Sequence, residues 1–255
     1  MKRIALLLLV LVVLASFVAA EDIAVAAAAD LGFAMKELAA RYQQKSGTKA
    51  SLSFGASGNF YSQIQSGAPY DLFFSADAEY PKKLAAGGFV EKTSLRTYAV
   101  GHLVLWIPNS SKLDLQQLKM DVLVQPSVQK VAIANPDHAP YGRAAMAALE
   151  HFGLKGLVSD KLVLGENVSQ AAQFVQSGNA QAGLIPLSLA MSPVMKASGT
   201  YWELPADAYP EIEQAVAILT SSKHKQAAQA FVDFVTSPEG AAVLRQYGFA
   251  LPARK

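Results

Sequence analysis

Short apolar runs alternate with amphipathic helical patterns along most of this chain, and that alternation restricts the fold more than any other feature of the sequence. Residues 23–27 form a buried strand candidate, and the helical stripe that follows Asp30 ends at Gly47. Residues 130–134 and 161–165 repeat the same strand signal in the second half of the chain. This order of elements predicts an α/β architecture with mainly parallel sheets and right-handed crossovers.

Two longer strand-like runs, residues 98–107 and 212–219, interrupt the alternation. We interpret them as paired crossings between two lobes, since no linker rich in Pro, Gly or Ser marks a boundary elsewhere. The sequence therefore predicts one lobe made of residues 21–101 together with 217–255, and a second lobe made of residues 102–216.

The segment 1–20 does not fit the α/β pattern. A short basic stretch is followed by a nearly continuous apolar run over residues 4–18 and by small residues before Glu21. This is typical of a secretory signal peptide, because the run is too short and wrongly flanked for a membrane-spanning helix. An uncleaved membrane anchor is the alternative.

The chain contains no cysteine. An exported protein of this kind must be stable without disulfides, and it also lacks the cysteine that a bacterial lipoprotein needs after its signal. We therefore expect a soluble monomer that is free in the periplasm of a Gram-negative cell.

Charge argues against a nucleic-acid partner. The chain has 22 basic and 20 acidic residues, and removal of Lys2 and Arg3 with the signal leaves it formally neutral. No stripe of Lys and Arg is present, so no nucleic acid is expected to bind.

The segment Gly55-Ala56-Ser57-Gly58 lies between a strand pattern and a short amphipathic helix. Ligands of parallel α/β sheets bind beyond the carboxyl ends of the strands, where helix N-termini offer unpaired N–H groups and partial positive charge. The glycines let backbone amides approach an anion, and the Ser57 hydroxyl can donate to it. On this turn alone, a Ser57 side chain that caps its own helix is the simpler interpretation.

Three further turns open helices in the same way, at Asp30, at residues 135–142 and at residues 165–168. Capping is the simpler interpretation of each turn taken singly. Together they offer backbone amides and one phenol, Tyr141, that can converge in a cleft.

Catalytic motifs are weak in this sequence. Asn59 stands where a Gly-x-Ser-x-Gly elbow needs its second glycine, and the four histidines show no metal-ligand spacing. We predict no enzyme activity, no cofactor and no directly coordinated metal ion. A secreted hydrolase that uses Ser57 and His138 is the alternative from another class of protein.

Four segments of the chain resemble the periplasmic molybdate-binding proteins of ABC importers: "AVAAAADLGFAMKELAARY", "SFGASGNFYSQIQSGAPYDLFFSAD", "ANPDHAPYGRAAMAAL" and "YGFALPA". The motifs keep the family's order from Ile23 to the C-terminus. The resemblance implies a two-lobed periplasmic binding protein of type II whose lobes close over a tetrahedral oxyanion. It implies high-affinity capture of molybdate, and also of tungstate, for a membrane permease with its ATPase. Another oxyanion or a cation as ligand is the alternative within this class.

The resemblance also assigns ligand contacts. Ser57 matches the family's serine in the second strand-to-helix turn, and Tyr141 lies in a Pro-x-Gly turn where some members use a tyrosine hydroxyl. Val168 matches a valine whose amide contacts the anion. Where some members place a late tyrosine, this chain has Pro186, so that contact is lost or passes to Ser188.

Asp30 departs from the family, which commonly has serine or asparagine there. A carboxylate about 4 Å from an anionic charge is repelled by about 4 kcal/mol at an effective dielectric near 20. We expect the Asp30 side chain to cap its own helix by accepting from the N–H of Gly32 or Phe33, and to meet the ligand only through its backbone. Affinity would then change little between about pH 5 and pH 8. A proton bound together with the ligand, or a ligand that is not an oxyanion, are the alternatives.

Overall fold

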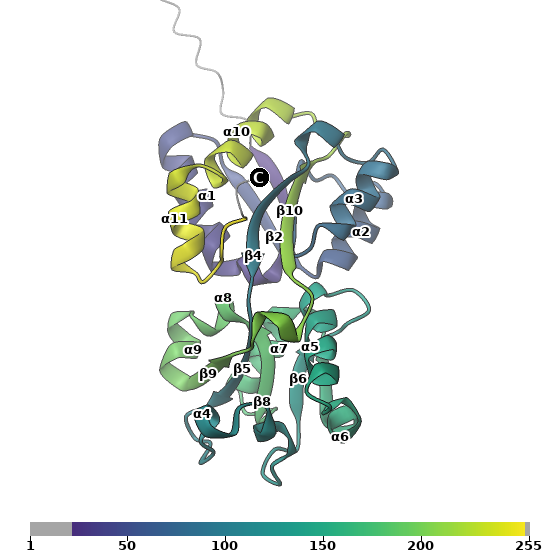
Figure 1. Cartoon of the computed structure of the whole chain (residues 1–255). Coiled ribbons are helices and arrows are strands. Elements are labelled where there is room, and N and C mark those ends of the chain that lie inside the picture. Colours follow the sequence, from purple (N-terminus) through teal and green to yellow (C-terminus); the bar gives the residue numbers. More distant parts are fainter. Residues whose placement is uncertain (1–21, 253–255) are drawn as a thin grey trace, which may run out of the picture.

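The structure, a computed structural model, describes residues 22–252, so the signal peptide predicted for residues 1–20 lies outside the described residues. Figure 1 shows two lobes, one above the other, each with a five-stranded sheet and helices on both sides. The predicted α/β architecture with two lobes is confirmed. Within residues 22–252, no helix combines the length and the apolar character needed to cross a membrane.

The first lobe contains a sheet with the strand order β2-β1-β3-β10-β4. Its strands are β1 (Ile23–Ala28), β2 (Ala50–Gly55), β3 (Leu72–Ser75), β4 (Arg96–Gly101) and β10 (Ile212–Ile218). The helices on one side are α1 (Gly32–Ser46), α10 (Lys225–Val235) and α11 (Pro238–Gln246), and those on the other side are α2 (Ser57–Gln65) and α3 (Glu79–Ala86). Because helices cover both faces, the central strands are apolar on both faces.

The second lobe contains a sheet with the strand order β7-β6-β8-β5-β9. Its strands are β5 (Leu103–Pro108), β6 (Val131–Ala134), β7 (Leu162–Gly165), β8 (Ala182–Pro186) and β9 (Gly199–Glu203). Its helices are α4 (Leu115–Leu118), α5 (Pro140–His151), α6 (Lys155–Val158), α7 (Val168–Gln176), α8 (Leu187–Ala190) and α9 (Pro193–Ser198). Short 3₁₀ turns complete the two lobes: η1 (Ala29–Leu31), η2 (Lys92–Ser94), η3 (Lys119–Val124), η4 (Ser159–Lys161) and η5 (Ala206–Ala208).

The two sheets share one arrangement. In each, three neighbouring strands pair in parallel, and the fourth strand, β10 or β5, is antiparallel to both of its neighbours. At the junction between the two lobes, the chain enters each lobe through its reversed strand, so β10 and β5 run away from the junction. The parallel strands run toward it. Helices that follow the parallel strands therefore begin at the junction between the lobes.

The chain crosses this junction twice. β4 ends at Gly101 and β5 begins at Leu103, which lies at the position predicted for the first boundary. The second boundary differs from our expectation, because β10 pairs with β3 and β4 and belongs to the first sheet. Residues 212–216, which we assigned to the second lobe, therefore lie in the first, and the return crossing is made by residues 204–211. An apolar strand pattern shows that a strand exists and does not show which sheet it joins.

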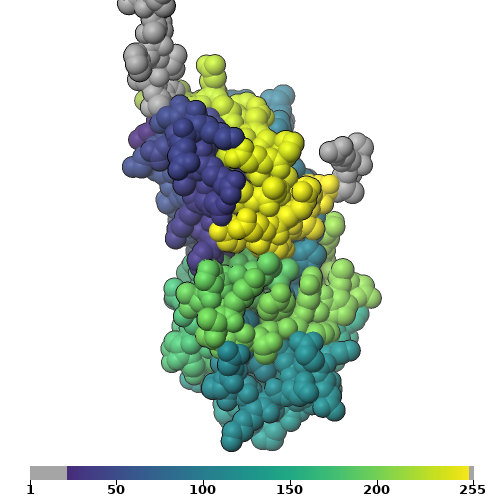
Figure 2. All heavy atoms as spheres, turned by 90° about the vertical axis from the view of Figure 1, so that its left-hand side faces the viewer, coloured from purple at the N-terminus to yellow at the C-terminus, as the bar shows by residue number. Residues whose placement is uncertain are grey.

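Both ends of the described chain belong to the first lobe. Figure 2 shows the N-terminal segment in purple beside the C-terminal segment in yellow, above the green second lobe. The Tyr247 hydroxyl donates to Glu37 of α1 at 2.8 Å, and Lys45 at the end of α1 pairs with Glu239 of α11. The C-terminal helices thus complete the lobe that the N-terminal strands begin.

Candidate functional site

A small cavity lies at the junction, where helices of both lobes begin. Its volume is ≈ 10 Å³, close to what a single water molecule requires, so the lobes stand closed against each other. Residues of both lobes line it: Ala28, Ala29, Asp30, Gly55, Ala56, Ser57, Ala76, Ala139, Pro140, Tyr141, Asn167 and Val168.

Four of the five residues expected at a ligand site, Asp30, Ser57, Tyr141 and Val168, line this cavity. The fifth, Ser188, is buried behind the cavity lining, and its hydroxyl donates to the backbone oxygen of Asp30 at 2.8 Å. The structure therefore gives Ser188 a role in holding the turn at Asp30, and does not place it in the lining.

Ser57 is the first residue of α2, and its side chain makes no cap hydrogen bond. Its hydroxyl instead accepts from the backbone N–H of Ala76, which directly follows β3, at 2.9 Å. A hydroxyl that accepts one hydrogen bond still has its own O–H to donate. The capping interpretation of Ser57 is therefore wrong, and the side chain keeps a donor at the cavity.

Gly58 serves the contact between the lobes. Its N–H donates to the backbone oxygen of His138 at 2.8 Å, and a Cβ at this position would lie 2.7 Å from the His138 Cβ. We expected the glycines of this turn to bring amides to an anion. The Gly58 amide is used across the junction instead, because only a residue without a side chain lets the two lobes approach so closely.

Tyr141 occupies the first turn of α5 and is 2% exposed. Its hydroxyl hydrogen-bonds the Asp30 carboxyl group and lies 3.3 Å from Gln214 Nε2. Gly101, at the first crossing, leaves the space that this hydroxyl occupies, since a Cβ there would overlap it. Burial, and then the nearby Asp30 carboxylate, raise the pKa of the Tyr141 phenol well above its usual value, so the phenol stays protonated and can donate.

The Asp30 side chain is 1% exposed and faces the cavity. Its Oδ2 accepts from Gln214 Nε2, while its Oδ1 makes no hydrogen bond of ordinary geometry with any described residue. Burial raises the pKa of this carboxyl from 3.8 to about 6, against the opposing effect of the Gln214 and Tyr141 hydrogen bonds. No basic side chain is among the causes of this pKa shift, so Asp30 is a buried acid whose charge no nearby cation stabilises.

The expectation that Asp30 caps its own helix is wrong. The 3₁₀ turn η1 separates β1 from α1, so the N-cap of α1 is Leu31, and no side chain caps either segment. The Asp30 carboxyl instead has Gln214 of β10 and Tyr141 of α5 as its side-chain partners.

Gln214 is the site residue that sequence reasoning missed. It lies on β10, is fully buried, and accepts from the Tyr98 hydroxyl at 2.6 Å while its amide donates toward Asp30 and Tyr141. The signal that marks it is an uncharged polar residue at a buried position of β10, directly before the apolar run 215–218.

On the second lobe, α7 begins at Val168 and is capped by Asn167, whose Oδ1 accepts from Ser169 at 2.9 Å and from Gln170 at 3.2 Å. The cap provides an acceptor for these two amides. It provides none for the Val168 amide, and a helix has no internal acceptor for its first N–H groups, so the Val168 N–H can donate to a ligand. Together α2, α5 and α7 direct the positive ends of their dipoles at one cavity.

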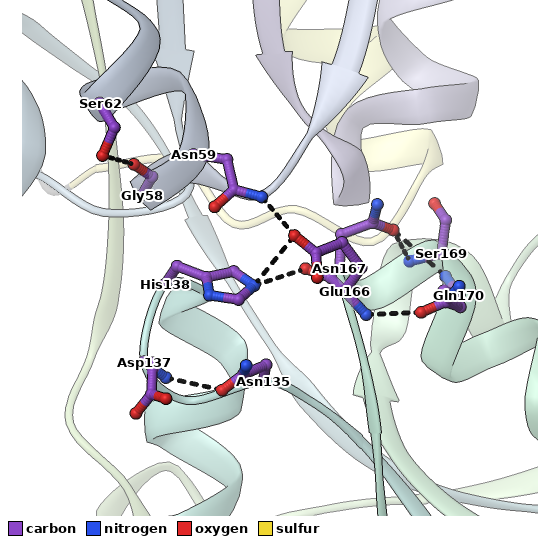
Figure 3. A network of polar contacts seen from close by, with 10 residues as sticks. All are labelled: Gly58, Asn59, Ser62, Asn135, Asp137, His138, Glu166, Asn167, Ser169 and Gln170. Atoms are coloured by element: carbon purple, nitrogen blue, oxygen red, sulfur yellow. Dashed lines mark hydrogen bonds and ion pairs between the residues drawn. The ribbon is translucent and has the colours of Figure 1, made fainter. Parts of the chain in front are cut away.

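Polar contacts also join the lobes outside the cavity, and we call these the rim contacts. Figure 3 shows Asn59 Nδ2 donating to Glu166 Oε1 at 2.5 Å, with the His138 ring 3.0 Å from the Glu166 backbone oxygen. Elsewhere on the rim, Arg143 Nη2 contacts Asp77 Oδ2 at 2.5 Å. The rim contacts are more exposed than the residues of the cavity.

The site offers donors for binding and no arrangement for catalysis. The Ser57 hydroxyl and the His138 ring have different partners, Ala76 and Glu166. Over residues 22–252, no three or more His, Asp or Glu side chains gather in a way that would hold a metal ion. No Lys or Arg lines the cavity, so a bound anion would be held by hydroxyls, amides and helix ends.

Comparisons with known proteins agree with this geometry. The sequence profile described as "Bacterial extracellular solute-binding protein" matches residues 23–250. The molybdate-binding protein ModA of Azotobacter vinelandii is 40% identical over 91% of both chains, and that of Rhodobacter capsulatus is 37% identical over 91% of this chain and 89% of its own.

The solved structure of the Azotobacter vinelandii periplasmic molybdate-binding protein superposes with a TM-score of 0.85 and 34% identity, covering 91% of this chain and 100% of that one. The likeness confirms the predicted two-lobed periplasmic-binding-protein fold, and the prediction of a binding protein rather than an enzyme is confirmed with it. The chain belongs to the family of bacterial extracellular solute-binding proteins.

Proposed function

We propose that this protein captures molybdate, and also tungstate, in the periplasm and delivers it to the membrane permease of an ABC importer. Relatives that match over nine-tenths of the chain are molybdate-binding proteins. The cavity between the lobes supplies the kind of site that such a ligand needs.

One observation carries the proposal. Three helix N-termini from two lobes meet at a cavity lined by the hydroxyls of Ser57 and Tyr141 and by no basic side chain. Donors of this kind satisfy the oxygens of a fully ionised dianion, and helix ends spread compensating charge without a buried ion pair that needs desolvation.

A ligand held by both lobes also accounts for closure. It binds the closed state more strongly than the open state, since only the closed state brings Ser57 and Tyr141 to the same cavity, and it therefore shifts the population toward closure. The closed protein presents a surface made of both lobes, which the permease would recognise. Release is left to the permease and its ATPase.

Calorimetric titration of the chain without residues 1–20 tests the ligand. Molybdate and tungstate should bind tightly, sulfate and phosphate more weakly, and no ester substrate should be hydrolysed. Absence of binding by every oxyanion, together with binding of a cation, would reject the proposal.

The location and the partner need separate tests. We expect the protein in the periplasmic fraction as a monomer, with a mature mass that lacks the signal peptide. We also expect it to stimulate the ATPase of its reconstituted importer only when molybdate is present. Stimulation by the ligand-free protein to the same level would contradict recognition of the closed state.

A further inference from the structure

The Asp30 carboxyl group is the one feature of the cavity that opposes an anionic ligand. It lies in the lining beside the donors Ser57 and Tyr141 and is buried from solvent. Two negative groups in a space that excludes water repel each other with little screening. Binding of a dianion beside an ionised Asp30 would therefore be strongly disfavoured.

We propose that Asp30 takes up one proton when the oxyanion binds, so that its carboxyl group becomes a hydrogen-bond donor to the ligand. This inference rests on the proposed function and concerns the same site. The proton comes from solvent, and one O–H bond forms on the carboxyl group. Oδ2 already accepts from Gln214, so Oδ1, which has no partner of ordinary geometry, is the oxygen that carries the proton.

The groups around Asp30 leave no other way to neutralise it. Tyr141 of α5 and Tyr98 of β4 face it as titratable groups, and burial raises the pKa of both phenols, which remain neutral donors. Gln214 of β10 and Ser188 of α8 contact the residue and carry no charge. Ser57 of α2 and Val168 of α7 complete the lining, also without charge.

Two basic side chains at the junction, Arg143 and His138, are engaged on the rim. Arg143 pairs with Asp77, and His138 contacts Glu166. Neither Arg143 nor His138 lines the cavity or forms an ion pair with Asp30 in the described part of the chain. A proton is thus the available counter-charge for the buried carboxylate.

The energetics favour uptake on binding. In the closed structure, burial raises the pKa of Asp30 to about 6 against the opposing hydrogen bonds of Gln214 and Tyr141, so the group is mainly ionised at neutral pH when no ligand is bound. A dianion in the same cavity disfavours the ionised form and raises this pKa further. Binding near neutral pH therefore draws a proton onto Asp30.

The wild-type protein provides the first test. Molybdate remains a dianion between about pH 6 and pH 8, so its own charge does not change over this range. Affinity should fall roughly 50-fold from pH 6 to pH 8, because the protonated fraction of the free site falls by that factor when its pKa is near 6. Titrations in buffers of different ionisation enthalpy should show uptake of about one proton per molybdate at pH 8.

Variants locate the proton. Asp30→Asn keeps an acceptor for Gln214 and offers a permanent N–H donor, so its molybdate affinity should be independent of pH, with no proton uptake. Asp71→Asn is the matched control, since Asp71 is a buried acid of the same lobe that accepts from Ala24 N and Ser222 Oγ outside the cavity. Its pH profile should remain that of the wild type.

The outcomes separate the two proposals. Tight molybdate binding without proton uptake would overturn the role of Asp30 and leave the proposed function standing. Proton uptake that persists in Asp30→Asn would place the proton on another group and likewise overturn it. Absence of oxyanion binding at every pH would instead reject the proposed function itself.

Discussion

Two sets of contacts join the lobes, those around the cavity and the rim contacts, and they differ in solvent exposure. In the cavity set, Asp30, Tyr141 and Gln214 are each at most 2% exposed. In the rim contacts, the Arg143 side chain is 38% exposed and that of Glu166 is 58% exposed. Exposed pairs are screened by water and salt and contribute little, whereas a buried polar group must be satisfied or neutralised.

This difference assigns different tasks to the two sets. Under the proposed function, the buried set would decide which ligand is accepted, because each of its donors and its one acid act where no solvent compensates for a mismatch. The rim contacts adjust how readily the lobes part. Variants in the two sets should therefore differ in magnitude and in their response to pH and salt.

The largest effect is expected for Asp30→Asn in the ligand-free protein. The folded pKa of about 6 lies above the ordinary 3.8, so the folded state binds more protons between these values and loses stability as pH rises through them. This loss of folding stability is complete above pH 6 and amounts to roughly 3 kcal/mol. The variant should thus gain about that much at pH 8 and nothing near pH 4, by urea unfolding. An equal gain at both pH values would contradict the assignment.

Ser57→Ala should weaken molybdate binding by about 1.5–3 kcal/mol, the cost of a lost hydrogen bond to a charged group. It also leaves the buried N–H of Ala76 without its acceptor and should lower stability by about 1–3 kcal/mol. Ser62→Ala on the same helix is the control, since its hydroxyl donates to the Gly58 oxygen outside the cavity. Lower stability with unchanged affinity would restrict Ser57 to holding Ala76.

Gly101→Ala should destabilise the protein by about 1–3 kcal/mol, because the added methyl group overlaps the Tyr141 hydroxyl. Adding Tyr141→Phe, which removes the overlapping oxygen, should restore part of this loss. Gly156→Ala has open space around its Cβ and serves as the control. If the double variant loses as much stability as the two single variants lose together, the overlap with the Tyr141 hydroxyl is not the cause of the loss.

The smallest effect is expected on the rim. A double-mutant cycle with Arg143→Ala and Asp77→Ala should give a coupling energy of about 0.2–1 kcal/mol in molybdate affinity, and the coupling should shrink at high salt. A coupling energy that exceeds the effect of Ser57→Ala on affinity, or that does not change with salt, would contradict the weak, screened contribution assigned to the rim contacts.

Much of the fold was accessible from the sequence because local signals and the final structure agree. α1 ends where the sequence places its stop signal, since Gly47 adopts φ 77°. The convergence of Ser57, Tyr141 and Val168 was predictable in outline, because the helices that follow parallel strands begin at one edge of each sheet and the two edges meet at the junction. The contact of each residue came from the resemblance to the molybdate-binding family.

The rest depended on contacts between distant segments. The direction of the Asp30 carboxyl is set by a 3₁₀ turn and by Gln214, which lies 184 residues away on another strand. The sheet that β10 joins is likewise decided by pairing with β3 and β4. No local propensity encodes such partners, because the same apolar run fits either sheet.

The place of β10 between β3 and β4 also dictates an order of assembly. The strands of the second sheet come from one continuous stretch of chain, residues 103–203, so this sheet needs no strand from the rest of the chain. The first sheet lacks the strand between β3 and β4 until residues 212–218 arrive, so β4 has no neighbour to pair with in its own sheet before then. The lobe that begins the chain is therefore the last to be completed, and a chain that stops before residue 212 leaves β3 and β4 without the strand that joins them.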